Sequence, residues 1–251
     1  MRVATWNVNG VRARAAQLVG WLAEARPEVV CLQETKARPD QLAPSLCDLD
    51  GYHCLWHPAP KGYSGVALHV RRDWAQAVEF FHPPHDMESR LVCARVGRVV
   101  FASLYMPNGG KDYAAKIAFM HAMIDWVRAV HAAGDQLVLA GDMNVARAPL
   151  DVHPKLQDPT VVGQSAEERG LFADMLVGLV DAGRHLHPAD DRLFTWWPYW
   201  RESRQRNIGW RLDYVLISEA LLPRLTRCEL MRDLGTSDHC PVVATLELGG
   251  D

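Results

Sequence analysis

The chain has 251 residues, of which 49% are hydrophobic and 23% are charged, and its formal net charge at pH 7 is −3. This composition excludes a disordered or fibrous protein, and we expect one globular α/β domain over residues 1–251. No apolar run reaches the roughly 18 residues that a membrane span requires, and no signal core opens the chain, so we expect a soluble, cytoplasmic protein with no membrane partner. The small net charge neither supports nor excludes DNA as a partner, because acidic metal ligands lower the total without abolishing a local basic face.

The six cysteines predict a reducing compartment. None forms a C-x-x-C pair and most lie within apolar segments, so buried, reduced thiols are favoured over zinc ligands or a disulfide framework. They are Cys31, Cys47, Cys54, Cys93, Cys228 and Cys240.

The N-terminal residues predict a β-α-β unit followed by hairpins. A strand-like run at Val3–Asn7 precedes apolar residues at helical spacing up to Ala25, and Pro27 closes that helix ahead of a strand at Val29–Gln33. The next runs are separated by turn residues and predict two antiparallel hairpins. Their strands are Tyr52–His57 with Val66–Val70, and Val92–Arg95 with Val99–Leu104.

The second half adds two helices, a strand and two irregular stretches. Apolar residues at three- and four-residue steps predict a long helix over Tyr113–Ala133, ahead of a strand at Leu137–Ala140. Ser165 fits, with Glu168, a capping box at the start of the next helix. Residues 144–165 and 188–209 show no clear periodicity, and long loops beside a rigid core are where a substrate is usually held.

Polar side chains follow several of these strands where each strand ends. Asn7 ends the first strand, Glu34 follows the second, and Asp142 and Asn144 follow the strand at 137–140. Strand ends can meet at one edge of a sheet, and an oxygen-rich cluster suits a hard divalent cation such as Mg²⁺ or Mn²⁺. A solitary Glu34 would more often be a solvated strand end, but its parallel with Asn7 and Asp142 favours a metal site.

Spacing also predicts how the side chains are directed. Asp142 and Asn144 are two residues apart, which in an extended backbone directs both to one face. Asp238 and His239 are adjacent, so their side chains diverge and another carboxylate is needed to orient the imidazole. Asp213 is a candidate, because a carboxylate bonded to one ring nitrogen leaves the other nitrogen facing the reaction.

Six motifs in series resemble the exonuclease III family of abasic-site DNA endonucleases, within the endonuclease/exonuclease/phosphatase superfamily. They keep the family's order from residue 6 to residue 241, which makes the series far more specific than any single tetrapeptide. The motifs are Trp6-Asn7-Val8-Asn9-Gly10 with Arg12, Leu32-Gln33-Glu34-Thr35-Lys36, Leu104-Tyr105-Met106-Pro107-Asn108-Gly109, Gly141-Asp142-Met143-Asn144, Trp210-Arg211-Leu212-Asp213-Tyr214 and Ser237-Asp238-His239-Cys240-Pro241.

This resemblance implies a four-layer α/β sandwich like that of DNase I, in which two mixed β-sheets pack face to face with helices outside. It also implies that Glu34 is the principal ligand of Mg²⁺ or Mn²⁺, with Asn7 and Asp238 close to the metal. The protein is expected to act as a monomer on double-stranded DNA.

The catalytic roles that the resemblance implies are shared among five residues. Asp142 would orient or deprotonate the attacking water or protonate the leaving oxygen, and Asn144 would hold the phosphate. His239, paired with Asp213, would contact the phosphate or serve as the base, and the Tyr105 hydroxyl would stabilise the developing charge. A second metal site would consist of Asp142, Asn144 and His239, and the identity of the base stays open.

Further matching positions are expected to contact DNA. Trp196, Trp210 and Leu212 would form a small apolar pocket for a base-free deoxyribose that is flipped out of the duplex. Lys111 and Trp200 match positions that insert into the duplex beside the lesion, and Arg12 and Arg201 would add contacts.

Residues 201–211 form an arginine-rich run with two interpretations. Its positive charge would hold DNA phosphates, or it is a solvated surface. The run contains Arg201, Arg204, Arg206 and Arg211. Trp197 is expected in the core rather than in the pocket.

The function implied by the resemblance is Mg²⁺-dependent DNA repair. The enzyme would hydrolyse the phosphodiester 5′ to an abasic site, with 3′–5′ exodeoxyribonuclease activity and trimming of damaged 3′ ends. Residues 152–164 depart from the family pattern and leave the balance of these activities open. The alternatives are a related metallo-phosphoesterase acting on RNA, inositol phosphates or lipids, and a DNA-binding module without activity.

Overall fold

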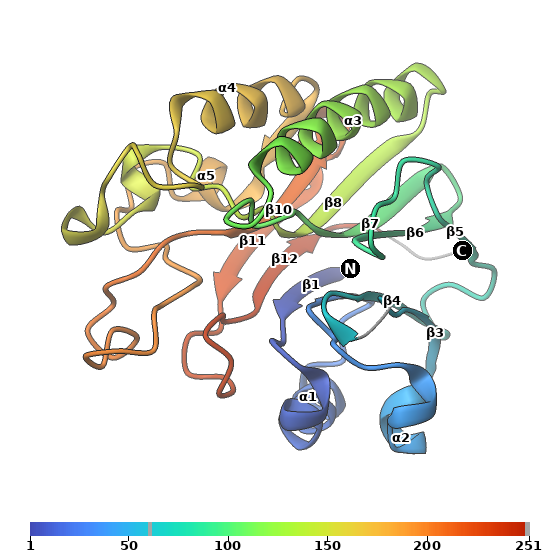
Figure 1. Cartoon of the computed structure of the whole chain (residues 1–251). Coiled ribbons are helices and arrows are strands. Elements are labelled where there is room, and N and C mark those ends of the chain that lie inside the picture. Colours follow the sequence, from blue (N-terminus) through green and yellow to red (C-terminus); the bar gives the residue numbers. More distant parts are fainter. Residues whose placement is uncertain (60–61, 249–251) are drawn as a thin grey trace.

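Two six-stranded sheets pack face to face, and helices cover both outer faces (Figure 1). The computed structural model describes residues 1–59 and 62–248. One sheet consists of β11 (Leu225–Leu230), β12 (Val242–Leu246), β1 (Arg2–Asn7), β2 (Val29–Gln33), β4 (Val66–Arg71) and β3 (Tyr52–His57), in that order. The other consists of β5 (Glu79–Phe81), β6 (Leu91–Val96), β7 (Val99–Tyr105), β8 (Gln136–Asp142), β10 (Asp213–Ser218) and β9 (Leu179–Asp181).

Both sheets are mixed. The pairs β1/β2 and β7/β8 are parallel, and the other neighbours are antiparallel. A helix crossover joins each parallel pair, since α1 (Val11–Ala25) lies between β1 and β2 and α3 (Tyr113–Ala132) lies between β7 and β8. The predicted four-layer sandwich of two mixed sheets is confirmed.

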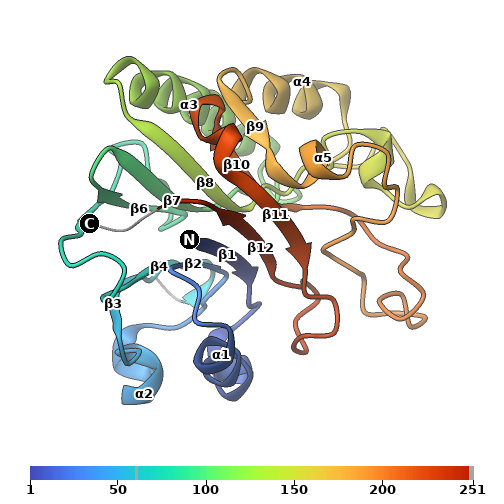
Figure 2. The same cartoon turned by 180° about the vertical axis from the view of Figure 1, so that it is seen from behind.

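The helices are divided between the outer faces, as the front and back views show (Figures 1 and 2). Side chains of α1 and of α2 (Pro44–Cys47) pack on the sheet that contains β1, and those of α3 and α4 (Ala166–Met175) pack on the sheet that contains β8. The short α5 (Ala182–Leu186) follows β9. Within the described part of the chain, no helix combines the length and the hydropathy that crossing a membrane requires.

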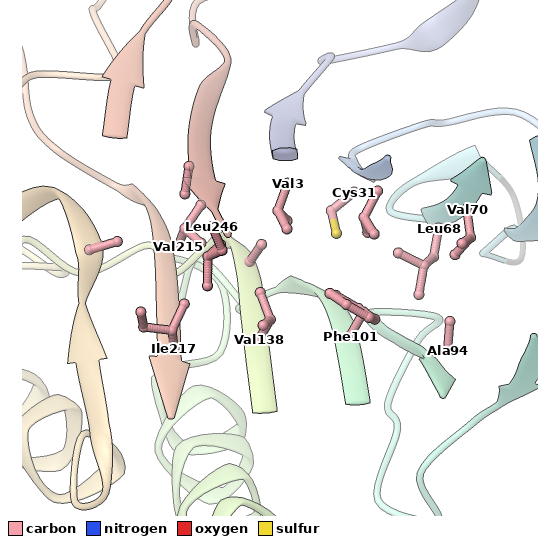
Figure 3. Close-up of a cluster of buried hydrophobic side chains, with 14 of the residues drawn as sticks. Val3, Cys31, Leu68, Val70, Ala94, Phe101, Val138, Val215, Ile217 and Leu246 are labelled. Atoms are coloured by element: carbon pink, nitrogen blue, oxygen red, sulfur yellow. The ribbon is translucent and has the colours of Figure 1, made fainter. Parts of the chain in front are cut away.

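The main core lies between the sheets (Figure 3). Val3, Cys31 and Leu68 from the first sheet meet Phe101 and Val138 from the second. Strand β2 shows why a nearly continuous apolar run is needed here: its residues alternate between the inter-sheet core and the core beneath α1, so both of its faces are buried.

Most of the predicted elements are confirmed with small shifts at their ends. The two hairpins pair as expected, α3 ends one residue early, and α4 begins directly after its N-cap Ser165, which forms the expected capping box with Glu168. The prediction missed α2, α5, β5, β9, β10 and β11. Most of these are too short for a periodic pattern, and β11 alternates poorly because much of it is exposed.

The strands that carry the polar residues finish at one end of the sandwich. Asn7 pairs with Gln33 across β1/β2, and Asp142 pairs with both Tyr105 and Asp213 across its two neighbours. The irregular stretches 143–165 and 187–212 project at that end (Figure 1). Residues as far apart in sequence as Asn7 and Asp213 therefore reach a common rim.

Candidate active site

Glu34, Asp142 and His239 meet at this rim. One ligand atom from each lies within 4.8 Å of the others, and the distance from His239 Nε2 to Asp142 Oδ2 is 3.9 Å. The Asn7 amide nitrogen donates to Glu34 Oε1 at 2.9 Å and to Asp142 Oδ2 at 2.8 Å. Two carboxylates and an imidazole at this spacing fit a divalent cation.

A lysine forms an ion pair with Glu34. Lys36 Nζ lies 2.6 Å from Glu34 Oε2 and also donates to Asn9 Oδ1 at 2.7 Å. Burial alone would raise the pKa of Glu34, but the Asn7 amide and the Lys36 ammonium outweigh burial and hold it below its ordinary value. Glu34 is therefore an anion that can accept a metal ion.

His239 and Asp213 form a buried dyad. His239 Nδ1 lies 2.8 Å from Asp213 Oδ2, and both residues are almost inaccessible to solvent. Burial lowers the pKa of His239, yet the carboxylates of Asp213 and Asp142 dominate and raise it well above its ordinary value. The contact proposed from sequence is present, and it leaves Nε2 directed toward Asp142.

Asp142 and Asn144 both face the site, but for a different reason from the one that spacing suggested. The expected extended backbone is wrong here, because β8 ends at Asp142 and Asn144 has a left-handed φ of 47°. Asp142 Oδ1 accepts the Asn144 N–H at 2.9 Å and closes a tight turn. Asn108 donates to Asn144 Oδ1 at 3.2 Å and adds a second amide.

Asp238 lies on another side of the site from its neighbour's imidazole, as their adjacency predicted. Its carboxylate accepts from Asn9 Nδ2 at 2.9 Å and from Trp196 Nε1 at 3.1 Å. Burial would raise the pKa of Asp238, but the charge of His239 and these two bonds lower it overall. The structure thus brings Glu34 into contact with Asn7, whereas Asp238 is bound by other groups.

A cleft of about 510 Å³ opens above these residues. Its polar lining comprises Glu34, Tyr105, Asn108, Asp142, Asn144, Asp238 and His239. Its apolar lining comprises Val161, Val162, Trp196, Trp210 and Leu212, and the two indoles meet edge to face at 5.6 Å. Burial and the nearby carboxylates of Glu34 and Asp142 raise the pKa of Tyr105 well above its ordinary value, so its hydroxyl stays a proton donor.

Four of the expected DNA contacts lie outside this lining. Arg12, Lys111, Trp200 and Arg201 are exposed, and Trp200 is 60% exposed. Trp197 is buried with Phe194 and Cys240, as expected of a core residue.

The arginine-rich run does not act as one surface. Arg201 and Arg206 are exposed, but Arg204 donates to the carbonyls of Arg232 and Ser237 and supports a turn. Arg211 is 3% exposed. The expectation that Arg204 and Arg211 hold phosphates is wrong, because their guanidinium groups already have partners.

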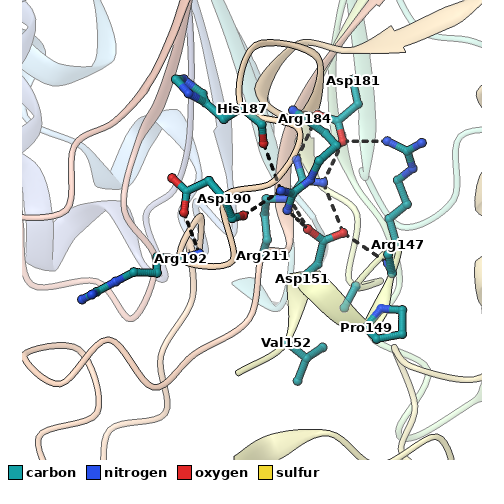
Figure 4. Close-up of polar contacts among 12 residues, drawn as sticks. Arg147, Pro149, Asp151, Val152, Asp181, Arg184, His187, Asp190, Arg192 and Arg211 are labelled. Carbon is teal, nitrogen blue, oxygen red and sulfur yellow. Dashed lines mark hydrogen bonds and ion pairs between the residues drawn. The ribbon is translucent and has the colours of Figure 1, made fainter. Parts of the chain in front are cut away.

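Arg211 instead sits in a buried ionic network (Figure 4). Its guanidinium contacts Asp151 Oδ1 at 2.8 Å and Asp181 Oδ2 at 2.7 Å, and Arg184 and Arg147 complete the pairing of these carboxylates. The network ties the loop after β8 to the end of β9. It also fixes the segment that carries the pocket residues on either side of Arg211.

Sequence reasoning gave no role to four residues of the site. Asn9 links Lys36 to Asp238, and Asn108 braces Asn144. Thr195 Oγ1 accepts the backbone N–H groups of residues 212 and 213 and so positions the dyad carboxylate. Asn9, Lys36 and Asn108 stand inside the motifs quoted above, so their motif membership was the available signal.

The chain matches known proteins over almost its whole length. The model of the endonuclease/exonuclease/phosphatase family matches residues 4–239. An exodeoxyribonuclease of Bacillus subtilis is 33% identical over 257 residues, which cover 96% of this chain and 98% of the relative. Recombination repair protein 1 of Drosophila melanogaster is 32% identical over 262 residues, and this chain spans 36% of that longer protein.

Solved structures give the same result. A 3′ phosphatase from Neisseria, bound to a product DNA hairpin, superposes with a TM-score of 0.88 at 32% identity, and the match covers 99% of this chain and all of the other. An AP endonuclease from Archaeoglobus fulgidus gives a TM-score of 0.87 at 29% identity with the same coverage. The chain therefore belongs to the endonuclease/exonuclease/phosphatase family, as its six motifs predicted.

Proposed function

We propose that this DNA-repair nuclease cleaves the phosphodiester 5′ to an abasic site in duplex DNA and also trims 3′ ends, using Mg²⁺ or Mn²⁺. The proposal is based on one observation: an acidic cluster and a buried His–Asp dyad lie at the same cleft, whose apolar side is lined by two tryptophans. The nearby relatives include both an AP endonuclease and a 3′ phosphatase, which supports testing both activities.

The cation would be held by Glu34 with Asp142 and His239 nearby, and Asp238 lines the same cleft. When bound, it would supply positive charge to the phosphate oxygens and the leaving oxygen. Asn7 keeps the carboxylates of Glu34 and Asp142 oriented through its amide nitrogen. Oxygen-dominated ligation favours Mg²⁺ or Mn²⁺ over Zn²⁺.

The remaining residues of the site would each have a separate role in the reaction. Asp142 would hold the attacking water and accept its proton, while His239, kept in one orientation by its contact with Asp213, would donate to the phosphate. The water oxygen would bond to phosphorus, the bond between phosphorus and the 3′ oxygen would break, and that oxygen would take up the proton that Asp142 accepted from the water. Asn144 and the Tyr105 hydroxyl donate to oxygens on which charge develops.

The apolar side of the cleft would select the substrate. Trp196, Trp210 and Leu212 form a wall that suits a deoxyribose without its base, and extruding such a sugar costs less than unpairing a normal nucleotide. The exposed Lys111, Trp200, Arg12 and Arg201 would contact the duplex around the lesion.

The assembly and compartment are further parts of this proposal. We propose a monomer, because the acidic cluster, the His–Asp dyad and the apolar wall that the reaction would use lie together in a single copy of the chain. A reducing compartment such as the cytoplasm is favoured because all six cysteines are free.

The decisive experiment compares four substrates with the same enzyme preparation. They are a duplex with one abasic site, a recessed 3′ end, a 3′-phosphate end and single-stranded RNA, each with Mg²⁺, with Mn²⁺ and with chelator. We expect a metal-dependent nick on the 5′ side of the abasic site and slower or no cleavage of RNA. Equal, metal-independent products would contradict the proposal, and cleavage confined to 3′ ends would remove its abasic part.

A further inference from the structure

Lys116 and Glu168 form an ion pair that solvent does not reach. Lys116 lies on α3 and Glu168 on α4, both side chains are 0% exposed, and Nζ lies 2.6 Å from Oε1. Buried charges are strongly unfavourable unless they are paired and fully hydrogen-bonded. The proposed chemistry uses neither residue, so the pair requires another explanation.

The ammonium group of Lys116 holds two backbone carbonyls beside the cleft. Besides Glu168, Nζ donates to the carbonyl oxygen of Asn144 at 2.7 Å and to that of Asn108 at 3.3 Å. Its three donors thus have three acceptors. The side chains of Asn108 and Asn144 line the cleft and bond to each other, so Lys116 fixes the backbone from which both amides extend.

The carboxylate of Glu168 holds the segment that leads into α4. Its oxygens accept the Gly163 N–H at 2.9 and 2.7 Å and the Ser165 hydroxyl at 2.7 Å. Gly163 has a φ of 93°, and its carbonyl accepts the Ala146 N–H at 2.8 Å. Gly163 directly follows Val161 and Val162, which form part of the cleft wall.

We infer that Lys116 and Glu168 are positioning residues that hold the amides of Asn108 and Asn144 in register with the Val161–Val162 wall. This inference rests on the proposed function, in which Asn144 donates to the scissile phosphate. A misplacement of about 1 Å in such a group lowers the rate of the chemical step by about a hundredfold. DNA affinity should change little, because it arises chiefly from phosphate contacts distributed over the exposed surface.

The test replaces the ion pair with an apolar pair of similar size, Lys116→Met with Glu168→Met. Such replacements are often neutral for stability, but methionine cannot hold the carbonyls or the Gly163 N–H. We expect kcat on the abasic duplex to fall by at least about tenfold while KM changes by less than about threefold. The matched control is Arg128→Met, which removes an exposed cation from the same helix and should leave kcat unchanged.

The inference would be overturned if the variant with both methionines unfolds cooperatively in urea and has the kcat of the wild type. That result is expected if the ion pair only stabilises the fold. If the double variant does not fold, Glu168→Gln supplies the same comparison, because glutamine keeps the shape of the glutamate side chain and one of its two acceptor oxygens. Its kcat should fall by about threefold or more with KM unchanged, and a wild-type kcat would again overturn the inference.

Failure of the proposed function would be recognised separately. If the wild-type chain cleaves none of the DNA substrates, the proposed function is contradicted. The positioning role can then still be tested by measuring hydrogen exchange at the Gly163 amide. That amide should exchange slowly in the wild type and at least about tenfold faster in Glu168→Gln. Equal exchange in both proteins would overturn the inference independently of activity.

Discussion

Replacing His69 with leucine should make the protein less sensitive to acid. His69 lies on β4 with no exposed surface, and its ring packs against Trp56 with 4.9 Å between centroids. Among the described residues neither of its ring nitrogens has a hydrogen-bond partner. Burial lowers the pKa of His69 from its ordinary 6.5 to about 3, so the folded chain keeps this imidazole neutral in mild acid.

The magnitude follows from proton uptake by the unfolded chain. Below the ordinary pKa of 6.5 the unfolded chain binds a proton at His69 that the folded chain does not bind, so the free energy of unfolding decreases as pH falls. Each pH unit between the two pKa values removes about 1.4 kcal/mol, which gives a loss of about 2 kcal/mol between about pH 7.5 and about pH 5. That loss is a large share of the roughly 5–15 kcal/mol by which a domain is stable.

The assay is urea unfolding of the wild type and of His69→Leu at both ends of this pH range. The wild type should lose about 2 kcal/mol more than the variant, with the slope against urea unchanged. The control His121→Leu removes an exposed histidine of α3 and should behave like the wild type. An equal loss of stability in the wild type and His69→Leu would refute the argument.

Three further predictions concern the dyad, the sheet and the ionic network. Asp213→Ala should lower turnover by at least about a hundredfold with DNA binding largely kept, because His239 loses its orienting partner. Single-turnover kinetics measure the first effect, and a DNA-binding titration measures the second. Gly141→Ala should destabilise the fold by about 3 kcal/mol or more in urea unfolding, since the new Cβ would lie 1.9 Å from the backbone oxygen of Leu104. Its control is Gly170→Ala on α4, where the new Cβ meets open space and should stabilise the fold by about 0.5–1 kcal/mol. Arg211→Met should lower the free energy of unfolding by about 3–5 kcal/mol, because it leaves two buried carboxylates short of charge.

Local patterns were sufficient to predict the frame of the molecule. The apolar runs at β1, β2 and β8 are long enough to be recognised, and their polar ends share a rim because β1/β2 and β7/β8 are parallel crossovers. The separation of the Asp238 and His239 side chains also followed from local geometry. What spacing could not show was the turn after Asp142, where a side chain captures the backbone N–H of Asn144 and replaces the extended conformation.

The burial of Arg211 could not be read from its neighbours in sequence. Arg201 and Arg206, in the same run, are exposed, so charge density alone gives no distinction. The difference arises from Asp151 and Asp181, which lie 60 and 30 residues away in sequence and are brought to Arg211 only by the completed fold. A buried guanidinium requires such partners, and their identity is a property of tertiary structure.

The loop after β8 is held in place by charge rather than by regular secondary structure. Residues 143–165 contain two short 3-10 helices, at Pro149–Asp151 and Pro154–Leu156, and no longer helix or strand. The segment is nevertheless fixed at Asp151 by Arg211 and at Gly163 by Glu168, so both walls of the cleft are anchored to buried ion pairs. Such pairs are poorly screened by salt, whereas contacts between exposed cations and DNA phosphates weaken steeply with salt. Rising ionic strength should therefore raise KM well before it lowers kcat, because the surface that binds the duplex loses affinity while the walls of the cleft keep their geometry.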